Sequence, residues 1–323
     1  MEKAALQTKK RTLKIISVLA TNFISSVGII VSNKYIFKYF KIHPIRLVAF
    51  HQMATTFLSI LGNCCGLYSI KPINIYKVLP LSIFFTLFIV FSNLSLMTNT
   101  VGTYQLLKCL SDPCILLFER YIFKTTYSTK VQLSFLPMVL GVFINSFYDI
   151  DFKLVGLVHG FIGIVCCAVY GILVGRKQKE LEINSLQLLY YQAPLSTIFL
   201  SLTLIVGNKY QFIQEDLEFF SNLSASSSAQ NNIDLPFISF LAIFTALSAY
   251  LVNFSTFWII GNTSIVSYAV FSKLKLCAIL ISGVVFFDEM MNFKQGLGIV
   301  LTLGGVFYYT FLKVQERKEG LPK

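Results

Sequence analysis

The chain has 323 residues, of which 55% are hydrophobic and 13% are charged, and its formal net charge is +12. Soluble globular proteins carry about 25% charged residues, so this composition excludes an ordinary soluble enzyme and indicates an integral membrane protein. No stretch has the pattern of a nucleic-acid-binding module, and we therefore assign the basic charge to membrane topology and anionic lipid headgroups. The lipid bilayer is the first expected partner, and nucleic acid is not expected to be one.

Ten apolar stretches are long enough to cross a bilayer, because a helix needs about 20 residues to span a hydrocarbon core of roughly 30 Å. They lack the alternation of barrel strands, so we expect an all-α membrane protein with ten transmembrane helices. In chain order the predicted spans are 13–35, 46–67, 78–97, 100–123, 133–147, 154–175, 186–206, 237–260, 264–287 and 295–312.

The connections between the spans predict the orientation. No cleavage pattern follows the basic N-terminal residues, so the first span is expected to be retained. An even number of spans places both termini on one side, and this side collects most of the Lys and Arg residues, which predicts cytosolic termini. The longest connection, 207–236, is then lumenal, and its sequon at Asn222 is a candidate glycosylation site.

The sequence also contains an internal repeat. The stretch beginning Asn93-Leu-Ser is echoed about 160 residues later by Asn253-Phe-Ser, and each is followed shortly by an Asn-Thr pair. We therefore predict a 5+5 repeat, with residues 1–153 as the first five-helix unit and residues 154–323 as the second. Because each unit has an odd number of spans, the units would have inverted topology, as in many secondary transporters that bind substrate at the repeat interface. The alternative is chance similarity between hydrophobic segments.

Three lysines lie inside predicted spans: Lys108, Lys273 and Lys275. An ionisable side chain at that depth costs at least ~2.5 to 3.5 kcal/mol and so points to a functional site. Ammonium groups at matching places of two repeats would bind a multiply charged phosphate. For Lys108, an ion pair with Asp112 one helical turn further on is an alternative that needs no ligand. Lys273 and Lys275 point to different sides of a helix, so only one of them is expected to face the cavity.

Other polar and aromatic side chains complete the predicted substrate site, because a ring can stack on a base and an amide can read its edge. Lys34 ends the first span, where substrate binding and snorkelling to the interface explain its position equally well. The remaining candidates are Tyr104, Gln105, Tyr190, Tyr191, Gln192, Tyr268, Asn33, Asn93 and Asn253. Tyr is also common at membrane interfaces without any such role.

We expect neither a cofactor nor a metal site. The cysteines lie in apolar spans without Cys-x-x-Cys spacing, and the histidines do not complete a metal-ligand set. The Asp-x-Asp pair of Asp149 and Asp151 leaves a metal-dependent glycosyltransferase as an alternative. No catalytic domain accompanies that pair, and no Gly-rich phosphate loop is present, so we do not expect an enzyme.

Several motifs resemble the nucleotide-sugar and triose-phosphate translocators of the drug/metabolite transporter superfamily. The stretch from Asn99 to Lys108 resembles their fourth-helix region, and the stretch from Trp258 to Lys275 resembles their ninth. The run Asn184-Ser-Leu-Gln-Leu-Leu-Tyr-Tyr-Gln-Ala-Pro resembles the E subgroup of solute carrier family 35. The similarity covers nearly the whole chain.

This resemblance implies an antiporter that exchanges a nucleotide sugar for a nucleoside monophosphate across a Golgi or endoplasmic reticulum membrane. It also implies that Lys275 contacts phosphate and that Tyr268 and the segment 190–192 handle the nucleotide. Ser272 stands where the family usually has glycine, Lys273 where it has His or Asn, and Tyr191-Gln192 where carriers of GDP-mannose have two asparagines, so guanine recognition is not implied. Exchange of a sugar phosphate for phosphate and a non-transporting receptor or scaffold remain alternatives, and a homodimer is left open.

Overall fold

The computed structural model describes residues 2–124, 128–149, 153–209, 235–262, 265–289 and 292–318, and this part of the chain is helical without a strand. The helices are α1 (Glu2–Tyr39), α2 (Pro44–Cys64), α3 (Leu79–Thr98), α4 (Val101–Cys109), α5 (Ser111–Phe123), α6 (Thr129–Leu133), α7 (Phe135–Tyr148), α8 (Leu154–Leu181), α9 (Ser185–Lys209), α11 (Leu235–Asn262), α12 (Ile265–Phe287) and α13 (Phe293–Lys318), with a short 3-10 turn at Ile75–Lys77. The sequon at Asn222 and most of the predicted lumenal loop 207–236 lie outside the described residues.

Eight helical segments of the described chain are long and apolar enough to cross a membrane. The all-helical membrane class is thus confirmed. The predicted spans 100–123 and 264–287 are not among the eight. The first of them is divided between α4 and α5, and the second corresponds to α12.

Two prolines explain two interruptions of the helices, one inside the predicted span 100–123 and one at the start of the predicted span 133–147. Proline lacks an amide hydrogen and its ring clashes with the carbonyl four residues before it. For Pro113 that residue is Cys109, where α4 ends, and for Pro137 it is Leu133, where α6 ends. The prediction of one continuous helix over 100–123 was therefore wrong, whereas α9 accommodates Pro194 in its interior.

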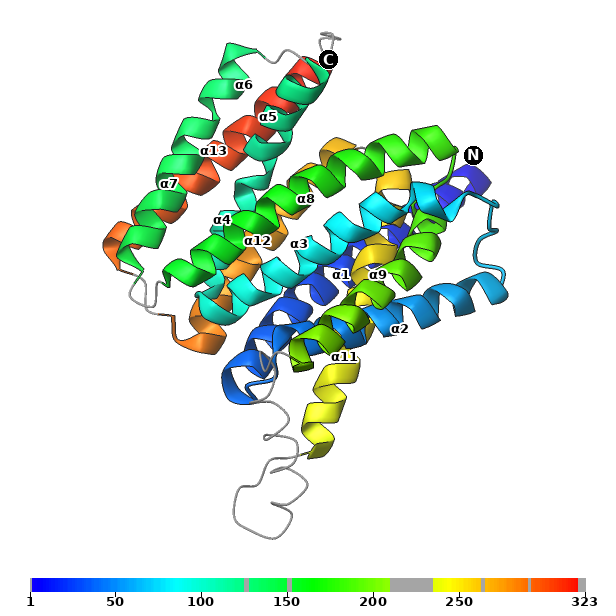
Figure 1. The fold of residues 1–323 in the computed structure, drawn as a ribbon. Coiled ribbons are helices and arrows are strands. Elements are labelled where there is room, and N and C mark those ends of the chain that lie inside the picture. Colours follow the sequence, from blue (N-terminus) through cyan, green and yellow to red (C-terminus); the bar gives the residue numbers. More distant parts are fainter. Residues whose placement is uncertain are drawn as a thin grey trace.

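The most extensive helix pairings join the first half of the chain to the second. α3 packs along α8, α7 along α13, α1 along α11 and α2 along α9, and the first two pairs are seen side by side in Figure 1. Glycines allow some of these close approaches. A Cβ atom at Gly156 of α8 would lie 2.3 Å from Thr98 Oγ1 of α3, and one at Gly141 of α7 would lie 2.4 Å from the Gly298 carbonyl oxygen of α13.

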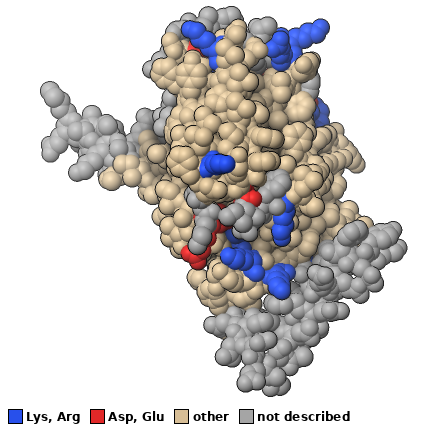
Figure 2. Space-filling view, turned by 90° about the vertical axis from the view of Figure 1, so that its left-hand side faces the viewer, with Lys and Arg blue, Asp and Glu red and all other residues tan. Residues whose placement is uncertain are grey.

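The outer surface is apolar where lipid would cover it. Large hydrophobic side chains of several helices are well exposed, among them Phe143, Phe147, Phe240, Val300 and Phe311. Figure 2 shows a broad band almost free of charged residues, with Lys and Arg gathered above it and a mixture of basic and acidic residues below. A surface of this kind is suited to hydrocarbon, since large contiguous apolar areas are rare on soluble monomers.

Candidate functional site

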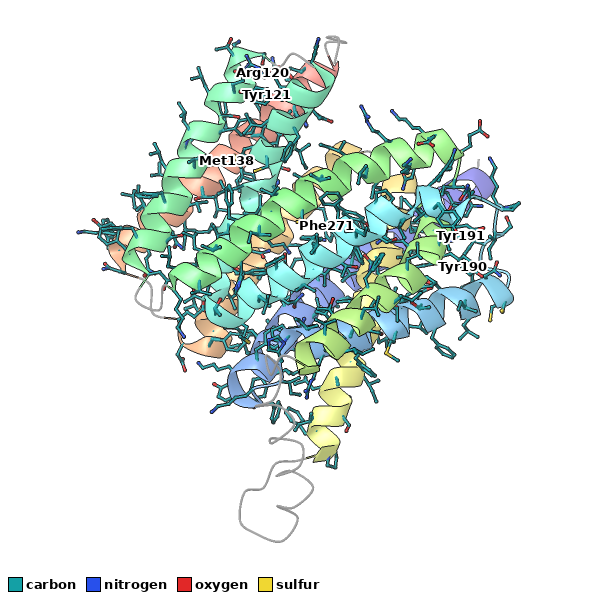
Figure 3. All side chains as sticks on the ribbon, in the orientation of Figure 1. Arg120, Tyr121, Met138, Tyr190, Tyr191 and Phe271 are labelled. Atoms are coloured by element: carbon teal, nitrogen blue, oxygen red, sulfur yellow. The ribbon has the colours of Figure 1, made fainter. Side chains whose placement is uncertain are left out.

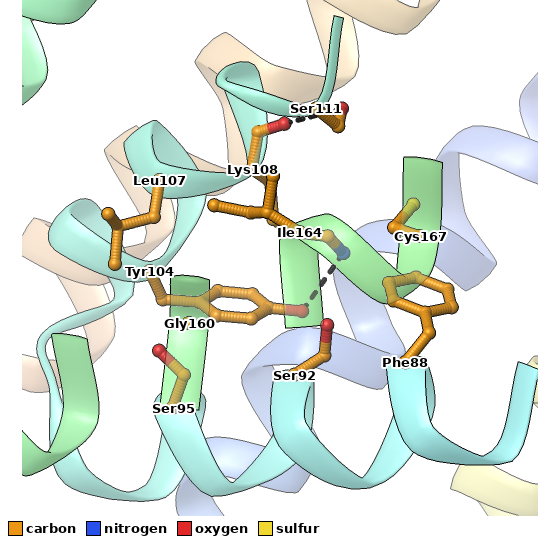
Figure 4. A pocket seen from close by; sticks show the side chains of 10 residues that line it. All are labelled: Phe88, Ser92, Ser95, Tyr104, Leu107, Lys108, Ser111, Gly160, Ile164 and Cys167. Atoms are coloured by element: carbon orange, nitrogen blue, oxygen red, sulfur yellow. Dashed lines mark hydrogen bonds between the residues drawn. The ribbon is translucent and has the colours of Figure 1, made fainter. Parts of the chain in front are cut away.

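An internal cavity lies between α3, α4 and α8 (Figure 4). Its volume is about 20 Å³, which is room for about one water molecule. Ligand pockets usually have ~300–1,000 Å³, so the cavity would have to widen to admit a substrate. Its lining combines polar, aromatic, aliphatic and small residues: Phe88, Ser92, Ser95, Tyr104, Leu107, Lys108, Ser111, Gly160, Ile164 and Cys167. Two of the predicted site residues, Tyr104 and Lys108, therefore share one cavity.

Lys108 points into this cavity from the last turn of α4. Its Nζ donates a hydrogen bond of 3.0 Å to the Tyr104 hydroxyl and lies 4.9 Å from the centre of the Tyr104 ring. The Phe88 ring lies 6.0 Å from the same nitrogen. A cation at a helix C-terminus and near aromatic faces is electrostatically stabilised without a carboxylate.

Asp112 does not take the place predicted for it. Its carboxylate pairs with Lys273 of α12, with 3.4 Å between Lys273 Nζ and Asp112 Oδ2. The alternative in which Asp112 neutralises Lys108 is therefore not what the structure contains.

Lys275 lies in a second polar cluster, between α12, α1 and α11. Its side chain is buried, and its Nζ donates to Asn22 Oδ1 at 2.6 Å and to Ser26 Oγ at 3.4 Å. The Phe271 ring, near the centre of the molecule in Figure 3, lies 5.5 Å from the nitrogen. Lys108 and Lys275 both lie within the helical bundle, Lys108 at the cavity and Lys275 in this cluster. The interior thus holds two cations that would both gain from a polyanion.

Lys34 has a structural role that the sequence did not suggest. Its ammonium donates to two main-chain carbonyls at the end of α3, those of Leu96 at 2.9 Å and of Asn99. These carbonyls belong to the last turn of α3, where helical partners are missing. Substrate binding by Lys34 stays a prediction, and the side chain turns inward to α3 rather than snorkelling.

The amide candidates are buried and only partly satisfied. Gln192 Oε1 accepts a hydrogen bond of 3.2 Å from Tyr170, whose ring stacks on Phe88 of the cavity, while Gln192 Nε2 has no partner among the described residues. Gln105 Oε1 is also without a partner in the described chain. Buried polar groups normally have partners, so these atoms could serve a ligand.

The asparagine candidates hold one another and their own helices. Asn33 Nδ2 donates to Asn93 Oδ1 at 3.3 Å, and Asn93 and Asn253 donate to the carbonyls of Ile89 and Ala249, each one turn earlier in its own helix. Asn93 and Asn253 thus behave alike in α3 and α11. Their role in substrate binding stays a prediction.

The structure places Tyr190 and Tyr191 away from the cavity. Both lie near the start of α9 at one edge of the molecule (Figure 3). The Tyr191 hydroxyl donates to the Lys71 carbonyl at 2.8 Å, in the connection between α2 and α3. The side chain of Tyr268 lies outside the part of the chain whose side chains are described.

A further carboxylate, missed in the sequence, anchors the helix that carries Lys108. Val101 N and Gly102 N, at the start of α4, donate to Glu289 Oε1 at 2.6 Å and Oε2 at 3.2 Å. Burial of Glu289 raises the pKa of its carboxyl, although these two donors and the nearby Lys34 favour the charged form. Asp149 accepts from Thr100 and Thr103 at the same helix start, so its predicted alternative role in a metal site gains no support from its contacts.

Asn22, Ser26, Phe88 and Ser92 are the site-facing residues that the sequence did not single out. The sequence could have indicated Asn22 and Ser26, because they are polar residues one helical turn apart in an otherwise apolar span. Polar residues in such helices often mark contacts between helices. Phe88 and Ser92 belong to residue types that are ordinary in membrane helices.

The chain as a whole is similar to known transport proteins. Residues 13–310 match the model of the Triose-phosphate Transporter family. The chain is 29% identical to UDP-xylose transporter 3 of Arabidopsis thaliana over 94% of this chain and 82% of that protein. It is 29% identical to UDP-rhamnose/UDP-galactose transporter 2 of Arabidopsis thaliana, over 100% and 90% of the two chains.

More distant similarities point the same way. GDP-fucose transporter 1 of Dictyostelium discoideum is 24% identical over 94% of this chain and 82% of that protein. A protein of known crystal structure superposes with a TM-score of 0.51 and 13% sequence identity, over 92% of this chain and 99% of that chain, which shows the fold alone. The match over residues 13–310 and the membrane-spanning helices establish that the chain belongs to the Triose-phosphate Transporter family and is a multi-pass membrane protein.

Proposed function

We propose that the protein is an antiporter that exchanges a nucleotide sugar for a nucleoside monophosphate across a Golgi or endoplasmic reticulum membrane. The observation that carries the proposal is the pair of interior lysines, Lys108 and Lys275, each with a neutral side chain as a hydrogen-bond acceptor. Two cations in a low-dielectric interior favour an anionic ligand. The phosphates of a nucleotide sugar supply that charge.

The relatives narrow the substrate class. The two plant relatives named above are transporters of UDP-xylose and of UDP-rhamnose and UDP-galactose. We infer a UDP-sugar as the substrate of this chain, with UMP as the counter-substrate. Phe88 and Tyr104 offer aromatic faces beside Lys108, which suits a base or sugar ring next to a phosphate.

We further propose that the ten predicted helices form the inverted 5+5 repeat, with cytosolic termini. Exchanging the two halves pairs α3 with α11, α1 with α8, α2 with α9 and α7 with α13. Under this exchange the α3–α8 contact becomes the α11–α1 contact, and the α2–α9 and α7–α13 contacts become themselves. All four of the most extensive pairings are compatible with the repeat, and this supports it.

The test is exchange by the purified protein in proteoliposomes. Vesicles loaded with UMP should take up labelled UDP-xylose or UDP-galactose faster than empty vesicles, and Lys275→Ala should lower the uptake by at least about tenfold, the effect of losing ~1.4 kcal/mol. Lys71→Ala is the matched control, because Lys71 forms an exposed ion pair with Glu182 at 3.0 Å, and such pairs contribute about 0–1 kcal/mol. Uptake by Lys275→Ala at the wild-type rate would exclude the phosphate role.

Exchange of a sugar phosphate for phosphate is the second candidate, favoured by the family to which the chain belongs. The same vesicles, loaded with inorganic phosphate and offered a triose phosphate, distinguish it. Uptake in these vesicles but not in UMP-loaded vesicles would replace the nucleotide-sugar proposal. Binding of nucleotides without exchange of either kind would instead favour a receptor.

A further inference from the structure

Asn22 of α1 is fully buried and connects three helices. Its Nδ2 faces α11 and donates to Ser255 Oγ at 2.8 Å, Thr256 Oγ1 at 2.9 Å and the Val252 carbonyl at 3.3 Å. Its Oδ1 faces α12 and accepts the bond of 2.6 Å from Lys275 Nζ.

The contacts of Asn22 allow only one orientation of its amide. The Val252 carbonyl only accepts hydrogen bonds and the Lys275 ammonium only donates them, so Nδ2 must face α11 and Oδ1 must face α12. The Ser255 hydroxyl already donates to the Leu251 carbonyl and therefore accepts from Asn22. A flipped amide would place two donors against each other and two acceptors against each other.

The neighbouring lysine on the same helix provides an internal comparison. Lys273 meets a carboxylate, that of Asp112, whereas the acceptor that Asn22 offers Lys275 is a neutral amide. Lys108 likewise donates to a neutral group, the Tyr104 hydroxyl. A neutral acceptor orients an ammonium group without cancelling its charge, whereas a carboxylate would compete with any anionic ligand.

We propose that Asn22 is a positioning residue for anion recognition: its neutral, orientation-locked amide fixes the direction of the Lys275 ammonium without adding a negative charge that would compete with a substrate phosphate. This inference rests on the proposed nucleotide transport. According to this proposal, α1 and α11 contribute to phosphate affinity. Val252, Ser255 and Thr256 of α11 orient the Asn22 amide, and the amide in turn orients Lys275.

Two substitutions test this role with a pair of ligands that differ only in phosphate. UMP carries the phosphate charge and uridine does not, so the ratio of their dissociation constants reports phosphate recognition separately from folding. In Asn22→Asp the new carboxylate should form an ion pair with Lys275, as Asp112 does with Lys273. The affinity for UMP should then fall by at least about tenfold, whereas the affinity for uridine should change by less than about twofold. Asn22→Ala removes the acceptor and should weaken UMP by a few-fold, again sparing uridine.

The measurement is equilibrium binding to the full-length protein in detergent, after size-exclusion chromatography has selected folded material. Asn145→Ala is the control for a general loss of stability, because this buried asparagine donates to Thr103 outside the Lys275 cluster. It should leave the ratio of the two dissociation constants at the wild-type value. If Asn22→Asp does not yield folded protein, Asn22→Ala decides.

Two results would contradict the inference. One is an unchanged affinity for UMP in the folded variants. The other is an equal loss of affinity for UMP and for uridine, which would indicate a purely structural role of Asn22. Failure of the wild-type protein to bind UMP would be distinguishable from both, and would reject the nucleotide site and this inference together. Wild-type UMP binding with a changed ratio only in the Asn22 variants supports it.

Discussion

Lys108 is the residue whose surroundings suggest the most direct experiment on the cavity. Lys108→Met keeps most of the side-chain volume and removes the charge, and should lower UDP-sugar exchange by at least about tenfold. Tyr104→Phe removes the hydrogen-bond acceptor of Lys108 Nζ but keeps the lysine charge, and should lower exchange by less than about tenfold. Initial rates in UMP-loaded vesicles measure both.

Tyr121→Phe is the matched control for the second substitution, since Tyr121 is exposed on α5 far from the cavity in Figure 3. Its exchange rate should equal that of the wild type. If Lys108→Met retains full activity, the cavity of Figure 4 is not the phosphate-binding part of the transport path.

The sequence predicted the interior location of these lysines more successfully than it predicted their partners. Charged residues in apolar spans are conspicuous, and Lys108 and Lys275 are both turned to the interior. The alternative that paired Lys108 with Asp112 was wrong, because the i,i+4 rule requires a continuous helix. The helix is interrupted at Leu110, between the two residues. The contact between Asp112 and Lys273 spans 161 residues and depends on tertiary packing that no local pattern contains.

Among the elements, the start of α4 depends on a carboxylate far away in sequence. Glu289 satisfies two amides that the helix leaves without partners, and burial raises the pKa of its carboxyl above the usual 4.5. The folded protein therefore holds this proton more tightly than the unfolded chain. Its contribution to stability is complete below pH 4.5 and is lost as the pH rises through the folded-state pKa.

Glu289→Gln removes this titration, so the melting temperature of the wild type relative to the variant should fall as the pH rises above 4.5. Thermal unfolding of both proteins in detergent from about pH 4 to about pH 8 measures the difference. A difference that does not depend on pH would show that Glu289 does not titrate in this way.

The helices themselves were largely predictable, because long apolar runs have few other structures available in lipid. Their interruptions were harder to predict. Pro113 and Pro137 break their helices, yet Pro194 does not break α9, so proline alone does not decide the outcome. Whether neighbouring helices support the freed carbonyls depends on packing that appears only in the assembled bundle.

For the molecule as a whole, the orientation in the membrane is open to test with native cysteines. Cys64 and Cys65 are exposed at the end of α2, on the side predicted to face the cytosol, whereas Cys109 and Cys166 are buried. A membrane-impermeant maleimide should therefore label sealed vesicles from the cytosolic side, and Cys64→Ser with Cys65→Ser should remove most of that labelling. Labelling from the lumenal side alone would reverse the proposed topology.

Hydropathy predicted the all-helical membrane class, and the described helices confirm it. The count of ten spans and the cytosolic side of the termini stay predictions. The location of the cavity did not follow from hydropathy. Gly160 and Ser95 meet in it from α8 and α3, and a Cβ at Gly160 would lie 2.9 Å from Ser95 Oγ. Such a close approach depends on which helix faces which, information that hydropathy alone does not contain.

The two halves of the chain are interlaced, because each of the most extensive helix contacts joins one half to the other. These contacts pair α1 with α11, α2 with α9, α3 with α8 and α7 with α13. Movement of one half as a rigid block would break the close helix contacts at Gly141, Gly156 and Gly298. We therefore expect a transport cycle to move packed helices of both halves together. A truncation that removes either half would expose the helix faces that the other half normally covers, and would leave them without a packing partner.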